Sequence, residues 1–282
     1  MKITIKSIAA LALGTVMFTT PALAQVADEL VIEGQPLVSR APAPEHLENV
    51  SEVMSGWLFR SIETRALELD DFENPAMVAV DTGLSIWETP EGDAGKSCKD
   101  CHGDIAEGMD GVRAMMPKIA ENGDLWTLEN YVNNCRTTRM EAEPWKWEAP
   151  EMLAMTAAIG LQSRGQPVNV AIDGPAAEWW ERGQQIYYTR VGQLDMSCAN
   201  CHEDNYGNYI RADHLSQGQI NGFPTYRLKW GGLGSIHRRF KGCMKNIRAT
   251  PYKPGGDEFK ALELYVASRG LGLSVETPAV RN

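Results

Sequence analysis

Two short segments with the same pattern carry the clearest chemistry in this chain. Residues 98–102 read CKDCH and residues 198–202 read CANCH, so both match Cys-x-x-Cys-His. The two thiols of this pattern can bond to the vinyl groups of a haem, and the adjacent imidazole can coordinate its iron. A Cys-x-x-Cys pair alone would also suit a dithiol redox centre or half a zinc site, but the following histidine and the repetition favour two covalent haem c groups. The attachment thiols and proximal ligands are then Cys98, Cys101 and His102 for the first haem, and Cys198, Cys201 and His202 for the second.

A single cysteine follows each motif, and it bears on what completes the iron coordination. Cys135 lies 37 residues after Cys98, and Cys243 lies 45 residues after Cys198. Methionine is the alternative sixth ligand, and a disulfide between the two spare cysteines is another alternative. Because the cysteines correspond between the halves and the methionines do not, we expect Cys135 and Cys243 to be the distal thiolate ligands. The methionine candidates are Met140, Met152, Met155, Met196 and Met244.

The two lone cysteines differ in the charges around them. Residues 227–249 contain eight basic or imidazole side chains and no acid, whereas acids and bases mix around Cys135. A basic segment in an acidic chain indicates an anion at the second site, with a solvated face or a docking patch as the alternative. Arg239 lies four residues before Cys243, so on a helix both share one face. Since a planar guanidinium suits the oxygens of a sulfonate or phosphate, we expect Arg239 to bind substrate beside Cys243.

The elements that must position these residues repeat at a spacing of 100. Sliding the chain by that distance aligns the two motifs and also pairs residues before them, such as Pro75 with Pro175 and Gly83 with Gly183. Matches that share one register without a gap indicate an internal duplication.

Each repeat unit is predicted to begin and end with a helix. Apolar periodicity and end signals predict helices over 75–89, 150–163, 175–190 and 257–268. The predicted fold class is mainly α, with two tandem class I cytochrome c-like domains joined by a loop near 165–173. The domains are residues 71–168 and residues 169–282, of which the second is expected to be catalytic.

The N-terminus has the features of an export signal. Two lysines precede an apolar run from Ile8 to Phe18, and residues 22–24 form a small-x-small cleavage pattern. The run is shorter than the roughly 20 residues that cross a bilayer, so we expect a cleaved signal peptide at 1–24, a periplasmic location and no membrane span. The mature chain keeps 25 basic and 37 acidic side chains, a net charge of −12. Nucleic acid is therefore excluded as a partner.

Residues 25–70 are predicted to form an N-terminal extension. Apolar residues recur with helical spacing from Leu47 to Leu69, which predicts a helix there that packs across a domain. His46 precedes this segment and is expected to be a surface residue.

The two motifs, the lone cysteine after each and the segment RFKGC at 239–243 resemble the SoxA family. This family provides the dihaem cytochrome subunit of the SoxAX complex of bacterial thiosulfate oxidation. The resemblance extends over essentially the whole mature chain. It implies an L-cysteine S-thiosulfotransferase, which joins thiosulfate oxidatively to a cysteine of the carrier protein SoxYZ. The product is an S-thiosulfonate, and two electrons pass to cytochrome c.

The same resemblance implies roles and partners. Cys243 corresponds to an active-site cysteine that the family uses as a persulfide, and Arg239 to a substrate-binding arginine. A SoxX-type monohaem cytochrome is implied as the partner in a heterodimer and as an electron acceptor. The alternative function is a dihaem electron carrier whose basic segment docks a redox protein. His214 and His237 are predicted to be structural, because neither has a counterpart in the first half.

Overall fold

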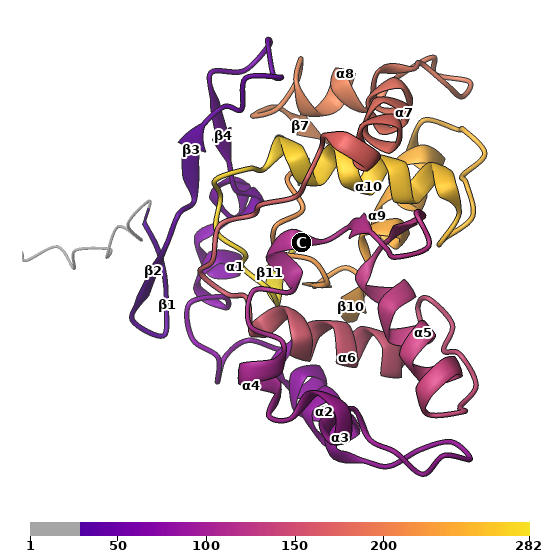
Figure 1. Cartoon of the computed structure of the whole chain (residues 1–282). Coiled ribbons are helices and arrows are strands. Elements are labelled where there is room, and N and C mark those ends of the chain that lie inside the picture. Colours follow the sequence, from indigo (N-terminus) through magenta and orange to yellow (C-terminus); the bar gives the residue numbers. More distant parts are fainter. Residues whose placement is uncertain (1–28) are drawn as a thin grey trace, which may run out of the picture.

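The computed structural model describes residues 29–282, and Figure 1 shows two groups of helices with short strands along one side. Helices α2, α3 and α6 lie together at the bottom of the view, and α7, α8 and α10 lie at the top. The elements are β1 (Leu30–Ile32), β2 (Gln35–Leu37), β3 (Arg40–Pro42), β4 (Glu52–Met54), η1 (Gly56–Phe59), α1 (Ile62–Ala66), α2 (Met77–Glu88), α3 (Cys98–His102), α4 (Ile105–Gly108), η2 (Arg113–Met115), β5 (Lys118–Ile119), β6 (Leu125–Trp126), α5 (Leu128–Arg139), α6 (Pro150–Leu161), η3 (Gly174–Ala176), α7 (Ala177–Tyr188), α8 (Cys198–His202), β7 (Tyr209–Ile210), β8 (Asp213–His214), β9 (Thr225–Arg227), β10 (Gly232–Gly234), α9 (Ile236–Asn246), α10 (Asp257–Arg269) and β11 (Ala279–Arg281).

Each group of helices contains a crossing of two helices that meet at a glycine. A Cβ on Gly83 of α2 would lie 2.2 Å from the carbonyl oxygen of Ala154 in α6. A Cβ on Gly183 of α7 would lie 2.1 Å from the carbonyl oxygen of Ala261 in α10. Only a residue without Cβ allows the backbones to approach this closely. The four predicted helices are confirmed as α2, α6, α7 and α10, each to within two residues at either end.

Both Cys-x-x-Cys-His motifs begin short helices in the same way. Ser97 accepts a hydrogen bond from the backbone N–H of Asp100, whose carboxylate accepts one from the N–H of Ser97. Ser197 and Asn200 make the same reciprocal pair at the start of α8. Such a capping box satisfies two backbone N–H groups that a helix start leaves open, so the serine before each motif fixes where its helix begins.

The N-terminal extension differs from its prediction, because Leu47 to Leu69 do not form one helix. They form β4, η1 and α1, and β4 pairs with β3 in an antiparallel hairpin. Ser55 and Ser61 then begin η1 and α1 as N-cap residues, and each cap fixes a new chain direction. The apolar residues of this segment are spaced by burial in separate clusters and not by one helix face. Leu47 packs beside Leu273, whereas Trp57 packs in a different cluster.

Residues 46 and 49 contact the second half of the chain. The side-chain amide of Asn49 donates to Glu203 at 3.1 Å. His46, predicted to be a surface residue, is half-buried, and its ring lies edge-on to Trp180 at 5.3 Å and hydrogen-bonds with Ser268. These partners lie far along the chain, so local sequence carried no sign of them.

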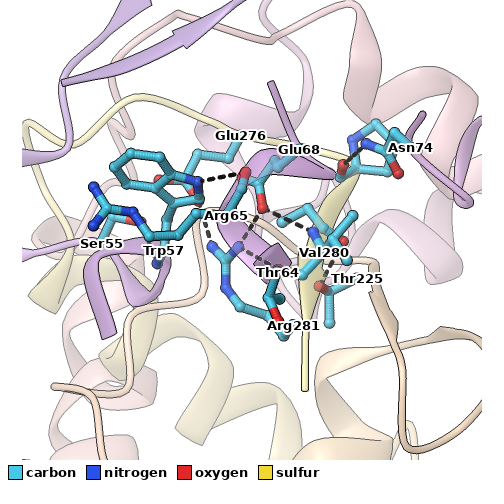
Figure 2. Close-up of polar contacts among 12 residues, drawn as sticks. Ser55, Trp57, Thr64, Arg65, Glu68, Asn74, Thr225, Glu276, Val280 and Arg281 are labelled. Atoms are coloured by element: carbon cyan, nitrogen blue, oxygen red, sulfur yellow. Dashed lines mark hydrogen bonds and ion pairs between the residues drawn. The ribbon is translucent and has the colours of Figure 1, made fainter. Parts of the chain in front are cut away.

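A buried charge cluster fastens this extension to the C-terminal strand (Figure 2). Glu68 accepts a hydrogen bond from the N–H of Val280 at 2.8 Å and pairs with Arg281, which also pairs with Glu276. Burial raises the pKa of Glu68 to about 8; Arg281 opposes the rise and Glu276 adds to it. Burial thus favours the protonated carboxyl of Glu68, while its contacts hold α1 against β11.

Strand β11 belongs to a small sheet that the sequence did not predict. It pairs in parallel with β9, which pairs antiparallel with β10. The predicted signal peptide, residues 1–24, lies outside the described residues. Among residues 29–282, no helix is long and apolar enough to cross a bilayer.

Candidate functional site

The second Cys-x-x-Cys-His segment faces the helix that carries Cys243. Helix α8 presents the motif, and Ser235 caps the N-terminus of α9, its hydroxyl accepting the N–H of Arg238. The side chains of His202 and Cys198 lie close enough to Cys243 to interact electrostatically with it. Groups from α8 and α9, separate in sequence, thus converge on one point.

The ring of His202 is held by the loop that follows it. Its Nδ1 lies 2.8 Å from the carbonyl oxygen of Ser216. Because a carbonyl only accepts, Nδ1 carries a proton, and Nε2 is the ring nitrogen that could bind a metal. Gly218, at φ +79°, lies against the same ring, where an added Cβ would come within 2.9 Å of Cγ and Nδ1. The loop therefore fixes both the orientation and the tautomer of His202.

Cys243 differs from its neighbours in its electrostatic surroundings. Burial alone would raise its pKa, but Arg239, His202 and Arg227 outweigh burial and lower it to about 7. For comparison, burial raises the pKa of the Cys198 thiol to about 12. The second site thus favours the thiolate of Cys243 and the thiol of Cys198.

Two arginines from separate parts of the chain, Arg239 and Arg227, act on this thiol. Arg239 lies one helical turn before Cys243 on α9, as predicted. Within residues 29–282, no acidic side chain forms an ion pair with Arg239. Arg227 lies 3.7 Å from Asp213, and Arg238 lies over the ring of Trp230 at 4.3 Å. Arg239 is therefore the guanidinium beside Cys243 whose charge is left for a bound anion.

Arg60 adds a further positive charge from the N-terminal extension. Burial, then Arg281, Arg227 and Arg239 lower its pKa to about 10, although Asp213 opposes them. The basic character of the second site is thus greater than residues 227–249 alone suggest.

The first site has the same parts in a more open setting. Cys135, on α5, interacts electrostatically with Cys98 and Cys101. His102 is exposed and lies 5.8 Å from the ring of Trp87. Burial and Cys101 raise the pKa of Cys135, the opposite of the shift at Cys243. Tyr131 stands four residues before Cys135, where the second site has Arg239.

The remaining candidates fall outside these two constellations. All six cysteines are free, so the alternative of a Cys135–Cys243 disulfide is wrong for this structure. His214 directs its ring nitrogens at two backbone carbonyls, those of Phe59 and Gly207. His237 is fully buried, accepts the N–H of Gly255 and lies 3.1 Å from Glu263. Both histidines are structural, as predicted.

The structure does not eliminate the methionines as alternative iron ligands at the first site. Met152 and Met155 are buried in α6, and Met155 packs in the cluster that contains Trp87 and touches Cys98. Thiolate ligation at the first site therefore stays a prediction.

The donor sets suit haem in both halves. In each half, two thiols and an imidazole on a capped helix are joined by a third thiol from another helix. His202, with its proton held on Nδ1, has the tautomer that an iron ligand needs.

Comparison with known proteins agrees with this description. The SoxA/TsdA cytochrome c domain model matches residues 82–168. The L-cysteine S-thiosulfotransferase subunit SoxA of Rhodovulum sulfidophilum is 57% identical over 258 residues, which is 90% of each chain. This chain belongs to the SoxA family. The SoxA subunit of Paracoccus pantotrophus is 54% identical over 282 residues, covering 98% of this chain and 97% of the relative.

A solved structure extends the likeness to the fold of the SoxA family. The crystal structure of SoxXA from P. pantotrophus contains a chain that is 55% identical and superposes with a TM-score of 0.88. The match covers 91% of this chain and 99% of the other. The cytochrome c assignment and haem c binding are thereby established at the level of the family.

Sequence reasoning missed the groups that reach the second site from elsewhere. The carbonyl of Ser216 is a backbone group, so residue type gives no sign of its role. Arg60 lies in a segment mispredicted as a continuous helix. A lone arginine 142 positions before His202 carried no signal of its own.

Proposed function

We propose that this protein holds two covalent haem c groups in two domains, residues 71–168 and 169–282, that arose by duplication. Residues 25–70 form an extension added to them. Support comes from the matched capping boxes and from the helix crossings at Gly83 and Gly183, all 100 residues apart. His102 and Cys135 would hold the first iron, and His202 and Cys243 the second.

The proposed activity is L-cysteine S-thiosulfotransferase, the name of the relatives. A bond forms between the outer sulfur of thiosulfate and a cysteine sulfur of the carrier SoxYZ, giving an S-thiosulfonate. The cysteine thiol loses its proton, and two electrons leave for cytochrome c. When bound, haem supplies one-electron acceptance, so a further redox centre must share the pair.

The residues of the second site have separate roles in binding the substrate, supplying a sulfur and holding the iron. Arg239 binds the sulfonate oxygens through its planar fork, and Arg227 adds positive charge behind it. Cys243 offers a thiolate, or its persulfide, as the sulfur that meets the substrate. Ser216 orients the ring of His202 through Nδ1, and Nε2 is the atom that would hold the iron.

The proposed partners follow from the family. A SoxX-type monohaem subunit forms the heterodimer and accepts electrons, and the likeness to a chain of the SoxXA crystal structure supports this pairing. SoxYZ and a cytochrome c acceptor complete the reaction in the periplasm, after cleavage of the signal peptide at about Ala24.

The observation that carries this proposal is the convergence of Cys243, His202 and the unpaired Arg239. Arg239→Gln tests it, because the change removes the charge and keeps a similar length. Loss of a charge-assisted hydrogen bond should raise the KM for thiosulfate roughly 10- to 100-fold. Turnover is measured as cytochrome c reduction with SoxYZ present.

The matched control is Arg139→Gln in the first half. Arg139 is exposed on α5, four residues after Cys135, so its loss should leave the KM unchanged. Equal effects of the two substitutions would contradict an anion site at Arg239. Unchanged KM in both would favour the dihaem electron carrier.

A further inference from the structure

The N-terminal extension forms hydrogen bonds with the loop that contacts the ring of His202. This loop, residues 213–218, contains both groups that contact the ring, the carbonyl of Ser216 and the backbone of Gly218. Gln217 stands between them and is 1% exposed. Hydrogen bonds that fix the side chain of Gln217 therefore also help to position Ser216 and Gly218, its neighbours in the chain.

Gln217 binds the free edge of β4 through both ends of its amide. Its Oε1 accepts the N–H of Met54 at 2.8 Å, and its Nε2 donates to the carbonyl of Glu52 at 3.0 Å. The amide thus pairs with the strand much as another peptide group would. Two hydrogen bonds on one planar group fix its orientation, and hence the backbone on either side of it.

A second pair of contacts holds the start of the same loop. Arg60 donates to the carbonyl of His214, and Nδ1 of His214 lies 3.1 Å from the carbonyl oxygen of Phe59. The extension therefore touches the loop at two places, before and after residue 215.

The extension is itself firmly anchored. Val53 of β4 is fully buried in a cluster with Leu273, and the cluster of Figure 2 ties α1 to β11. A loop held by an anchored strand can keep a short, constant distance between Ser216 and His202.

The first half has no such arrangement. His102 is exposed, and in the part of the chain that the structure describes no hydrogen bond reaches either of its ring nitrogens. The two proximal histidines thus differ although their motifs are alike.

We propose that Gln217 is a positioning residue that sets the strength of the hydrogen bond from His202 to Ser216, and so the reduction potential of the second haem alone. The inference rests on the proposed haem attachment at Cys198 and Cys201. A strong Nδ1–H bond makes the imidazole a better electron donor, which favours ferric iron. Through this bond the N-terminal extension keeps the second haem at a lower potential than its ligands alone would give.

Gln217→Met tests the proposal in the haem-loaded mature protein. Methionine has a similar length and no amide, so both bonds to β4 are lost. The midpoint potential of the second haem should shift upward, while that of the first stays at its wild-type value. Electron paramagnetic resonance should show altered g-values for one low-spin signal and not for the other. A merely structural role would not move the potential of one haem alone.

Met54→Pro removes one of the same bonds from the other side, because proline has no N–H. It leaves Gln217 unchanged and should shift the same potential in the same direction. Gln162→Met is the matched control, since Gln162 bonds within its own helix to the carbonyl of Ala158 at 2.9 Å. That substitution should move neither potential.

The mass of the intact protein distinguishes a failure of the proposed haem attachment from a failure of the proposed role of Gln217. A wild-type protein without a haem on Cys198 and Cys201 would refute the proposed function. Two attached haems with unchanged potentials in Gln217→Met and Met54→Pro would overturn only the role of Gln217. Equal shifts of both haems would overturn it as well, because they would indicate a general loosening.

Discussion

Gly183→Ala should test whether the helix crossing of the second half depends on the absence of one side chain. The new Cβ would lie 2.1 Å from the carbonyl oxygen of Ala261 and 2.8 Å from the Cβ of Tyr265. Two backbone segments must therefore move apart, since neither can rotate away as a side chain would. Helices α7 and α10 must then separate slightly at their crossing, which loosens the packing between them.

The magnitude follows from two opposing effects. Overpacking of this kind lowers the free energy of unfolding by about 3 kcal/mol. The higher helix propensity of alanine recovers about 1 kcal/mol. The net loss is about 2 kcal/mol, which lowers the Tm of a chain of this size by roughly 4 to 8 °C. Gly83→Ala should behave alike, because its Cβ would lie 2.2 Å from Ala154.

Gly242→Ala is the matched control for stability. Gly242 also lies in a helix, α9, but an added Cβ there would meet nothing within 4 Å. Its Tm should stay equal or rise by a few degrees, by about the 1 kcal/mol of propensity gained. Thermal unfolding followed by circular dichroism measures all three. If Gly183→Ala and Gly242→Ala melt together at the wild-type Tm, the reasoning about the crossing is refuted.

Two further predictions concern buried charges. Because the pKa of Glu68 is raised to about 8 from 4.5, its contribution to stability is complete below pH 4.5 and is lost as pH rises toward 8, by up to roughly 1 kcal/mol per pH unit. Glu68→Gln should flatten the pH dependence of Tm over that range, and an unchanged slope would contradict the assignment. Arg269→Met leaves Glu203 buried without its ion-pair partner, both groups being at most 3% exposed. It should cost about 3 to 5 kcal/mol in denaturant unfolding, and adding Glu203→Gln should recover part of the loss; a single variant as stable as wild type would show the pair to be unimportant.

Local signals explain what could be predicted from the sequence. The helices around Gly83 and Gly183 were predictable because apolar spacing, prolines and glycines act over a few residues. The juxtaposition of Arg239 and Cys243 was predictable because it needs only one turn of α9. Cys135 and Cys243 are free thiols. The comparison of the two halves predicted this, whereas the number of cysteines alone suggested a disulfide.

Long-range contacts explain what was missed. The segment from Leu47 to Leu69 has apolar spacing that fits a helix, yet its side chains are buried against residues such as Leu273. Gln217 and Met54 lie 163 positions apart, and their bond uses a backbone N–H. No residue type or local spacing marks such a pair, so only the folded chain reveals it.

The most direct test of the account is thiosulfate-dependent reduction of cytochrome c by Cys243→Ala, with SoxYZ and the partner subunit present. Intact mass first establishes that both haems remain attached. If the substrate sulfur meets Cys243 beside Arg239, turnover is lost in this variant. Turnover at the wild-type rate would contradict this role of Cys243 and would leave the protein as an electron carrier.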